Sequence, residues 1–256
     1  MTQPAVKPGA VAQSAPTVKL PDGFKAFTDL RPKRRLISVD IGHPGSGKTD
    51  WALRTSPEPI FYINLDPNGE EIAKKIILET GRRIYIARVE FTRDMSESAA
   101  KAEWAKCEKI IDNALKFNEG TMVLDTATEA DELWRVAHFG KLEQVSQYKY
   151  GERNRFWKGF FNDCFTGDMS VILLHKLKAL YVNDKRTDKF EISGWNGMEF
   201  EAQCVLYHEW VDPKGDEPGR FTFRVTKNNA NAELRGLEGD TENWSFDSLL
   251  SSTYDV

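Results

Sequence analysis

One eight-residue segment constrains the fold of this 256-residue chain more than any other. It runs from Gly42 to Thr49, reads Gly-His-Pro-Gly-Ser-Gly-Lys-Thr, and matches the pattern G-x-x-x-x-G-K-[ST] at each required position. An apolar run over residues 36–41 precedes it, and a helical pattern over residues 48–54 follows it. A strand, a glycine-rich turn and a helix in this order predict the first unit of an α/β domain.

The residues of this turn suit an anion. Its glycines let the backbone curl so that successive N–H groups point inward, and the following helix adds its positive N-terminal end. Lys48 would place an ammonium against the β- and γ-phosphates, and the Thr49 hydroxyl would ligate Mg²⁺. A chance match in a glycine-rich loop is the alternative, and the flanking strand and helix argue against it. The predicted nucleotide-binding residues are Gly42, His43, Pro44, Gly45, Ser46, Gly47, Lys48, Thr49 and Asp50.

The pattern of apolar runs separated by helical stretches continues along the chain. Further strands are predicted at residues 60–65, 84–89, 122–124 and 171–174, and further helices at residues 69–80 and 96–117. Several of the runs contain no polar residue, which is typical of strands buried on both faces of a parallel sheet. Residues 205–210 and 221–226 flank a strong turn signal and predict an antiparallel hairpin. The expected fold class is therefore α/β, with a mainly parallel sheet between helices and a hairpin near its C-terminal end.

A carboxylate follows one of these apolar runs. Residues 121–124 lead directly into Asp125 and Thr126. An acid at this place on a neighbouring strand is typical of the Walker B motif, in which it orients the metal. We expect Asp125 and Thr49 to hold Mg²⁺, with Thr126 assisting. The alternative is that Asp125 caps the next helix.

The order of these motifs resembles that of the RecA-like ATPases rather than nucleotide kinases or small GTPases. Residues 61–67, Phe-Tyr-Ile-Asn-Leu-Asp-Pro, are similar to the RecA segment that ends in the water-activating glutamate. The resemblance implies that Asp66 is the general base for attack of water on the γ-phosphate. The family residue is commonly Glu, and Asp is one methylene shorter, which leaves the efficiency of hydrolysis open. An N-cap of the next helix is the alternative for Asp66.

Two later segments extend the resemblance over residues 36–231. RecA-like proteins end the strand that corresponds to residues 171–174 in a polar residue that senses the γ-phosphate, and His175 matches it. Phage-encoded relatives of the single-strand-annealing type often use a His at this place. Residues 224–229 are similar to the run that closes the core, which implies that Lys227 reaches the γ-phosphate of a neighbouring subunit. The alternatives are a hydrogen-bonded core histidine and a solvated lysine.

Two segments combine cations with aromatic side chains. Residues 176–191 resemble the second DNA-binding loop of the RecA core, and residues 148–158 fall where such folds place DNA loops. Cations neutralise backbone phosphates while aromatic faces stack on unpaired bases, as in single-strand binding. The aromatic residues between 156 and 165 recur near helical spacing and are expected to form a buried face instead. The predicted DNA-binding residues are Lys149, Tyr150, Arg153, Arg155, Lys176, Lys178, Lys185 and Arg186.

Composition divides the chain into three parts and limits its function classes. Residues 1–31 are rich in Pro, Ala, Val and Gln and predict a disordered arm, residues 32–238 the RecA-like domain, and residues 239–256 an acidic tail. Whether that tail binds a partner, competes for the basic loops or packs one helix stays open. The net charge of −4 argues against a wholly basic coat for nucleic acid but not against a local basic surface.

The same composition bears on the compartment. No run approaches the ~20 apolar residues that span a bilayer, and the N-terminus lacks the apolar run of a secretory signal. The three cysteines have no spacing typical of zinc sites or disulfide frameworks. We expect a cytoplasmic protein without a membrane partner, in the host cytoplasm if a phage encodes it.

The leading hypothesis is a phage-type RecA-like ATPase that uses ATP and Mg²⁺ and acts on single-stranded DNA in recombination, annealing or replication. The resemblance also implies a homo-oligomer with nucleotide at the subunit interface, and a single-strand-binding or replication protein as a further partner. The competing hypothesis is a nucleotide-binding switch or scaffold for a protein partner, with negligible hydrolysis. A small-molecule kinase is less well supported, because residues 176–191 contain mainly Lys and one Arg where kinases usually have an Arg-rich lid.

Overall fold

The computed structural model describes residues 21–22, 33–92, 94–141, 149–182 and 185–254. The chain divides into two units, Met1–Lys33 and Arg34–Val256, and the second contains every element discussed below. The arm predicted over residues 1–31 lies outside the described residues, apart from residues 21 and 22. Within the part of the chain that is described, no helix is both long enough and apolar enough to span a membrane.

One nine-stranded sheet forms the centre of the second unit. Its strands are β1 (Ile37–Gly42), β2 (Ile60–Asn64), β3 (Ile84–Arg88), β4 (Thr121–Asp125), β5 (Ser170–Val182), β6 (Lys185–Ile192), β7 (Cys204–Val211), β8 (Arg220–Asn228) and β9 (Glu238–Asp240). The order across the sheet is β3-β2-β4-β5-β1-β7-β8-β9, and β6 pairs with β5. All pairs from β3 to β7 are parallel, whereas β7–β8, β8–β9 and β5–β6 are antiparallel.

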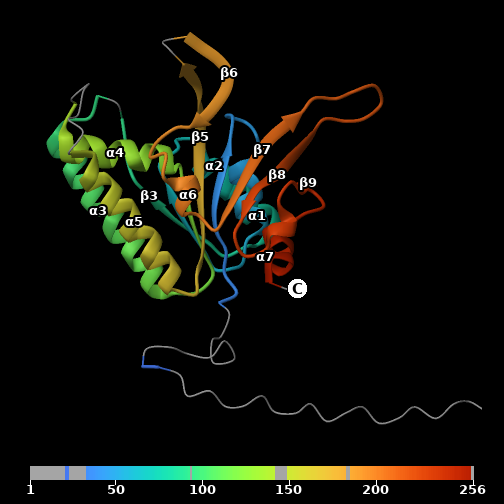
Figure 1. Ribbon diagram of the computed structural model, residues 1–256, viewed down its shortest axis with the longest axis horizontal. Helices are drawn as coiled ribbons and strands as arrows, with labels where there is room; N and C mark the ends of the chain where they lie inside the picture. The colour runs from blue at the N-terminus through green and yellow to red at the C-terminus, as the bar shows by residue number, and fades with distance from the viewer. Residues whose placement is uncertain (1–20, 23–32, 93, 142–148, 183–184, 255–256) are drawn as a thin grey trace, which may run out of the picture. The chain divides into compact units, whose positions relative to one another are not determined.

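Helices cover both faces of this sheet (Figure 1). On one face lie α1 (Lys48–Thr55), α2 (Gly69–Thr80) and α7 (Phe246–Tyr254), and on the other lie α3 (Glu97–Phe117), α4 (Ala127–Phe139) and α5 (Tyr150–Thr166). Two shorter segments, α6 (Met198–Glu201) and a 3-10 turn (Ala232–Leu234), connect later strands. Because side chains alternate along a strand, Leu173 packs in the α3–α5 layer and Leu174 in the α1–α2 layer.

The expected fold class is confirmed. One strand, β5, lies between β1, which leads into the glycine-rich loop, and β4, which ends in Asp125. The glycine-rich loop lies between β1 and α1, as the sequence predicts. The predicted hairpin is also present, formed by β7 and β8. The helix predicted at residues 69–80 has these same bounds.

Local capping explains where the longest helix begins and ends. The side chain of Ser96 accepts a hydrogen bond from the backbone N–H of Ala99, which satisfies one of the unpaired donors at the start of α3. At the other end Asn118 adopts a left-handed conformation with φ of 59°, and its N–H donates to Ala114 O. The helix expected over residues 96–117 therefore has a start and a stop that the sequence encodes.

The segment predicted as a polar DNA-binding loop at residues 176–191 is instead a β-hairpin. Strand β5 does not stop after Leu174 but continues to Val182, and β6 returns antiparallel to it. A register shift between Ala179 and Tyr181 marks an irregularity in the pairing. The predicted DNA-binding residues Lys178, Lys185 and Arg186 therefore lie on paired strands and not in an irregular loop.

Of the segment expected as an acidic tail at residues 239–256, the described residues, up to 254, are part of the domain. They supply residues of β9 and the whole of α7, whose Phe246 and Leu249 are fully buried against the α1 layer. The indole N–H of Trp51, in α1, donates to Trp244 O at 2.8 Å, and the Phe246 N–H donates to Thr55 Oγ1 at 2.9 Å. Of the alternatives for this segment, the structure shows a helix packed against the core.

Candidate functional site

A cavity of about 500 Å³ opens at the carboxyl ends of the central strands. In doubly wound sheets this edge is where ligands bind. Of the predicted nucleotide-binding residues, Pro44 to Asp50 line the cavity, and Gly42 and His43 lead into it from β1. The remaining lining residues come from other parts of the chain: Asp66, Asn68, Gly69, Ile72, Lys75, Asp125, Thr126, Lys176 and Phe221. We call this the phosphate-loop cavity.

The loop itself needs glycine at defined places. Gly45 and Gly47 have φ values of 78° and 81°, which side chains rarely adopt. A Cβ atom on Gly47 would also lie 2.9 Å from the Phe221 ring, and one on Gly42 would lie 2.4 Å from His208 O. The loop therefore curls closely against the sheet, with its backbone directed around the cavity.

Lys48 folds over this loop. Its Nζ donates to Gly42 O at 2.9 Å, to His43 O at 2.9 Å and to Ser46 Oγ at 3.1 Å, and the residue is only 9% exposed. Burial lowers the pKa of Lys48 to about 8, and the nearby charge of Asp125 opposes this effect. A buried ammonium with only neutral acceptors gains from an anion, because charge-assisted hydrogen bonds are stronger than neutral ones.

The two predicted metal ligands lie together. The Thr49 hydroxyl donates to Asp125 Oδ2 at 2.8 Å, and Asp125 is 2% exposed. A hydroxyl and a carboxylate are the hard oxygen donors that Mg²⁺ prefers, so this pair fits the predicted ion. Burial, as the largest cause, raises the pKa of Asp125 to about 6. A metal ion beside it would favour the ionised form.

Asp125 does not cap the following helix. Thr126 does so, because its side chain accepts a hydrogen bond from the Glu129 N–H at 3.2 Å. The alternative for Asp125 is thereby not what the structure shows. Thr126 also lines the phosphate-loop cavity, but its hydroxyl serves α4.

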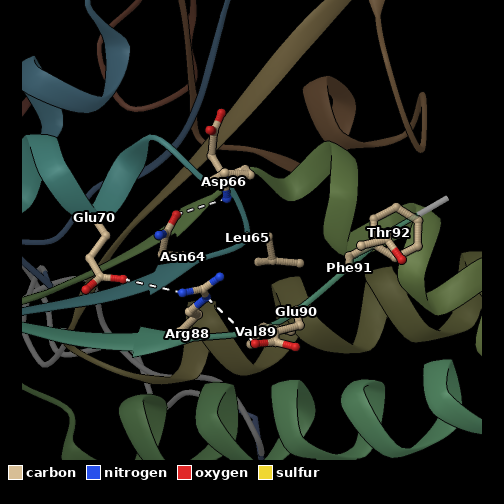
Figure 2. Close-up of a pocket in the computed structure, with 10 residues that line it drawn as sticks. Asn64, Leu65, Asp66, Glu70, Arg88, Val89, Glu90, Phe91 and Thr92 are labelled. Carbon is tan, nitrogen blue, oxygen red and sulfur yellow. Dashed lines mark hydrogen bonds and ion pairs between the residues drawn. The ribbon is translucent and has the colours of Figure 1, made fainter. Parts of the chain in front are cut away.

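Asp66 shares the phosphate-loop cavity with Lys48 and Asp125. Its Oδ1 accepts a hydrogen bond from the Asn68 N–H at 2.9 Å, which makes a turn just before α2, and Asn68 rather than Asp66 is the N-cap. In Figure 2 the Asp66 carboxylate points away from the Arg88 guanidinium. Asp66 therefore lines the same cavity as Lys48 and Asp125, with one carboxylate oxygen engaged by the backbone.

A smaller cavity of about 190 Å³ lies beside Asp66, between the ends of β2 and β3 (Figure 2). Arg88 forms long ion pairs of 4.0 Å with Glu70 and with Glu90 at its edge. Asn64 Oδ1 accepts from the Asp66 N–H at 2.9 Å and so fixes the start of the turn. The Asn64 side chain, at the edge of this cavity, therefore holds the turn that contains Asp66.

His175 does not line the phosphate-loop cavity, which corrects the expectation of a direct phosphate contact. Strand alternation turns it to the face opposite that of Lys176, where it is completely buried with Nδ1 3.3 Å from Ser193 O. Burial lowers the pKa of His175 to about 4, so the ring is neutral at physiological pH. Lys176, predicted as a DNA contact, is the residue of this pair that reaches the cavity.

Lys227 has a local role in this structure. Its Nζ donates to three backbone carbonyl oxygens, those of Glu199, Phe200 and Ala202, at 2.9, 2.6 and 2.6 Å. A cation at this position satisfies carbonyls at the C-terminal end of α6. It is therefore not a solvated lysine, and reaching the phosphate of a neighbouring subunit would require it to leave these partners.

The predicted DNA-binding residues fall into different environments. Arg153 is half-buried and forms an ion pair with the buried carboxylate of Asp131, which also accepts from the Trp157 indole N–H, so its guanidinium is already engaged inside the domain. Lys149 is half-buried, with its ammonium 5.7 Å from the centre of the Phe139 ring. The others outside the cavity are exposed: Tyr150, Arg155, Lys178, Lys185 and Arg186.

Sequence reasoning missed the buried polar groups that support the loop and the acid. The Tyr62 hydroxyl donates to Asp125 Oδ2 at 2.9 Å, and the structure places Asp40 and His208, both completely buried, 3.0 Å apart beneath the loop. All three belong to strands whose residues are mostly apolar. A polar residue inside a strand buried on both faces is the signal that could have found them, because such a group needs a partner.

Comparisons with known proteins found similar solved structures but no similar family model or curated sequence. No protein-family model matches the chain, and no curated protein matches it. Among the solved structures that are similar is the KaiC-like protein PH0186 from the hyperthermophilic archaeon Pyrococcus horikoshii OT3. It is 14% identical, with a TM-score of 0.44, over 82% of this chain and 84% of the other. A likeness of this size carries no conclusion about substrate or partner.

Proposed function

We propose that this chain binds a nucleoside triphosphate with Mg²⁺, and that it hydrolyses ATP. One observation carries the proposal: Lys48, Thr49, Asp66 and Asp125, which come from three separate parts of the chain, line one cavity around a curled glycine-rich loop. A triphosphate tail requires such a set, namely inward N–H groups, an ammonium, metal ligands and a carboxylate near the γ-phosphate. ATP as the base and hydrolysis as the reaction follow from the resemblance to RecA-like ATPases.

Each residue has a defined task in this proposal. The loop backbone and Lys48 bind the phosphates, and Thr49 with Asp125 would hold Mg²⁺, which supplies charge neutralisation when bound. Asp66 orients a water molecule for in-line attack and accepts its proton. His175 acts indirectly, through its contacts with Thr128 and Ser193.

The second part of the proposal is binding of single-stranded DNA by the β5–β6 hairpin. Figure 1 shows this hairpin extending from the sheet beyond the helices. It carries exposed Lys185 and Arg186 together with Tyr181, whose side chain is 61% exposed. Cations beside an exposed aromatic ring suit a backbone with unpaired bases. Roles in phage-type recombination, annealing or replication, and a homo-oligomer or replication partner, belong to the same proposal.

Comparison of Lys48→Ala with the wild-type chain tests both parts. We expect the wild type to bind Mg-ATP, to turn it over faster with single-stranded DNA, and to bind DNA in a nucleotide-dependent way. Lys48→Ala should lose nucleotide affinity and that dependence together. Wild-type protein that binds no nucleotide in calorimetry would overturn the proposal.

Charge reversal on the hairpin tests the DNA surface separately. Lys185→Glu with Arg186→Glu should weaken binding of a labelled oligonucleotide and reduce the salt dependence, since each phosphate contact contributes to it. Lys109→Glu with Lys116→Glu on exposed positions of α3 is the matched control, with the same change in net charge. Equal loss in both variants would show that only net charge matters, not the hairpin.

A switch or scaffold with negligible hydrolysis is the second candidate, and one observation favours it. One oxygen of the short Asp66 side chain is already engaged by the Asn68 N–H. Only the second oxygen is then left to orient water, on a side chain one methylene shorter than the glutamate of RecA-like ATPases. Measuring ATP binding and turnover on the same sample separates the two, because a switch binds without turnover.

A further inference from the structure

Lys176 lies where strand β5 passes the phosphate loop. In the pairing of β1 with β5, Lys176 is the partner of Gly42, the first residue of the loop. Its side chain is 36% exposed and lines the phosphate-loop cavity. The charge of Lys176 is also one of the causes that lower the pKa of Lys48, so the two ammonium groups are close enough to repel each other.

A carboxylate from the neighbouring helix holds this lysine. The Lys176 Nζ lies 2.5 Å from Glu129 Oε1, in the first turn of α4, and the Lys176 N–H donates to Thr128 Oγ1 at 3.0 Å. Glu129 follows Asp125 by four residues, so the ion pair ties β5 to the helix that begins next to the metal-ligand candidate. The second oxygen, Oε2, is buried and has no hydrogen-bond partner among the described residues. The carboxylate therefore holds the ammonium through one oxygen only.

We propose, on the basis of the proposed function, that Lys176 is a second phosphate-binding cation of the same subunit and that it contacts the terminal phosphate of a bound triphosphate. Glu129 then competes with that phosphate for the ammonium and holds it at the edge of the cavity until nucleotide arrives. The terminal phosphate carries more charge and more acceptor oxygens than one carboxylate, so it competes successfully for the ammonium.

This assignment predicts discrimination between a triphosphate and a diphosphate. The loop and Lys48 also bind the β-phosphate, which both nucleotides have, whereas Lys176 contacts only the terminal phosphate of the triphosphate. A purely structural ion pair between β5 and α4 predicts something else, namely a change in stability with no change in the ratio of the two affinities. The ratio of ATP to ADP affinity is therefore the quantity to measure.

The experiment titrates the full chain with fluorescent ATP and ADP analogues in the presence of Mg²⁺. We expect Lys176→Met to weaken triphosphate binding about tenfold, the loss of one charge-assisted contact, and diphosphate binding much less. Glu129→Gln releases the lysine and should raise the triphosphate preference. Lys101→Met is the matched control, since Lys101 forms an exposed ion pair of 2.6 Å with Glu97 on α3, and the ratio should not change.

The outcomes separate this inference from the proposed function. A wild-type chain that binds neither nucleotide removes both. A wild type that binds both, with an unchanged affinity ratio in Lys176→Met, overturns the role of Lys176 alone. If circular dichroism shows that Lys176→Met does not fold, two other variants test the inference. Lys176→Arg, which keeps the charge, must retain the wild-type ratio of ATP to ADP affinity, and Glu129→Gln must raise that ratio. An unchanged ratio in Glu129→Gln overturns the inference.

Discussion

At the scale of single residues, Asp125 determines how the site responds to pH. Its pKa is raised to about 6, chiefly because the carboxyl group is buried. A protonated carboxyl is a poor ligand, so protons compete with Mg²⁺ at this residue. The ionised form prevails above pH 6, and the neutral form below it.

We therefore expect the affinity for Mg-nucleotide to fall as the pH is lowered through 6, approaching about tenfold per pH unit below that point. The measurement is a set of isothermal titrations between pH 5 and pH 8. Asp125→Asn provides the reference, because any pH dependence left in that variant belongs to the phosphates of the nucleotide. Identical slopes in the two proteins would contradict a role for this carboxylate.

Tyr62 is the second residue whose effect can be predicted. Burial raises the pKa of its phenol, so the group stays protonated and donates to Asp125. Tyr62→Phe leaves that buried carboxylate with one donor fewer, and we expect a loss of about 1–3 kcal/mol in the free energy of unfolding. Urea denaturation of Tyr62→Phe against Tyr85→Phe, an exposed tyrosine on β3, checks it. Equal curves for the two variants would show that the phenol hydroxyl contributes nothing.

At the scale of elements, α7 is a structural part of the nucleotide-binding half. Its Phe246 packs against Trp51 of α1, the helix that carries Lys48 and Thr49 at its start. Phe246→Ala removes a completely buried ring, and we expect it to destabilise the chain by about 3–5 kcal/mol. Chemical denaturation measures this loss.

Ser251→Ala, at an exposed position of the same helix, is the control and should stay within about 0.5 kcal/mol of the wild type. If Phe246→Ala behaved like Ser251→Ala, α7 would be a dispensable tail after all.

Elements with a one-sided or fully apolar pattern could be predicted from the sequence, and others could not. Helix α2 was predicted with its observed bounds, because its apolar positions and the glycines at both ends mark it. The β5–β6 hairpin was not predicted, because most of its side chains are exposed and its sequence does not alternate between apolar and polar residues as a half-buried strand does. Helix α7 was not predicted either. Its few apolar residues are separated by acidic residues and serines, and their role in the core becomes clear only from the contact of Phe246 with Trp51.

The candidate site divides in the same way. The loop, Asp66 and Asp125 have local signatures, so the sequence predicted each of them directly after a strand, and the structure places them around one cavity. The choice between His175 and Lys176 depends on which face of β5 meets the cavity, and that requires the register with β1. The partners of Lys227 and Arg153 come from segments up to 28 residues away, which no local pattern reveals.

At the scale of the whole molecule, the site joins elements from many parts of the second unit, so a ligand should stabilise it globally. Binding to the folded state alone, at a ligand concentration 100 times the dissociation constant, adds about 2.7 kcal/mol. For a domain of this size that corresponds to a rise on the order of 5–10 °C in the unfolding temperature.

Differential scanning fluorimetry with Mg-ATP measures this shift. Lys48→Ala should unfold at the same temperature with and without nucleotide. A shift of equal size in that variant would mean that nucleotide binds elsewhere on the chain.

The continuity of β5 has a consequence for how this protein can vary. The strand enters as a fully buried segment at Ser170 and leaves as one arm of an exposed hairpin at Val182. A deletion or insertion of one residue before His175 would swap the two sides of everything after it. The imidazole would then face the loop and the ammonium would be forced into the apolar interior. A change in the length of the strand between Ser170 and Lys176 would thus disrupt the core and the cavity at once.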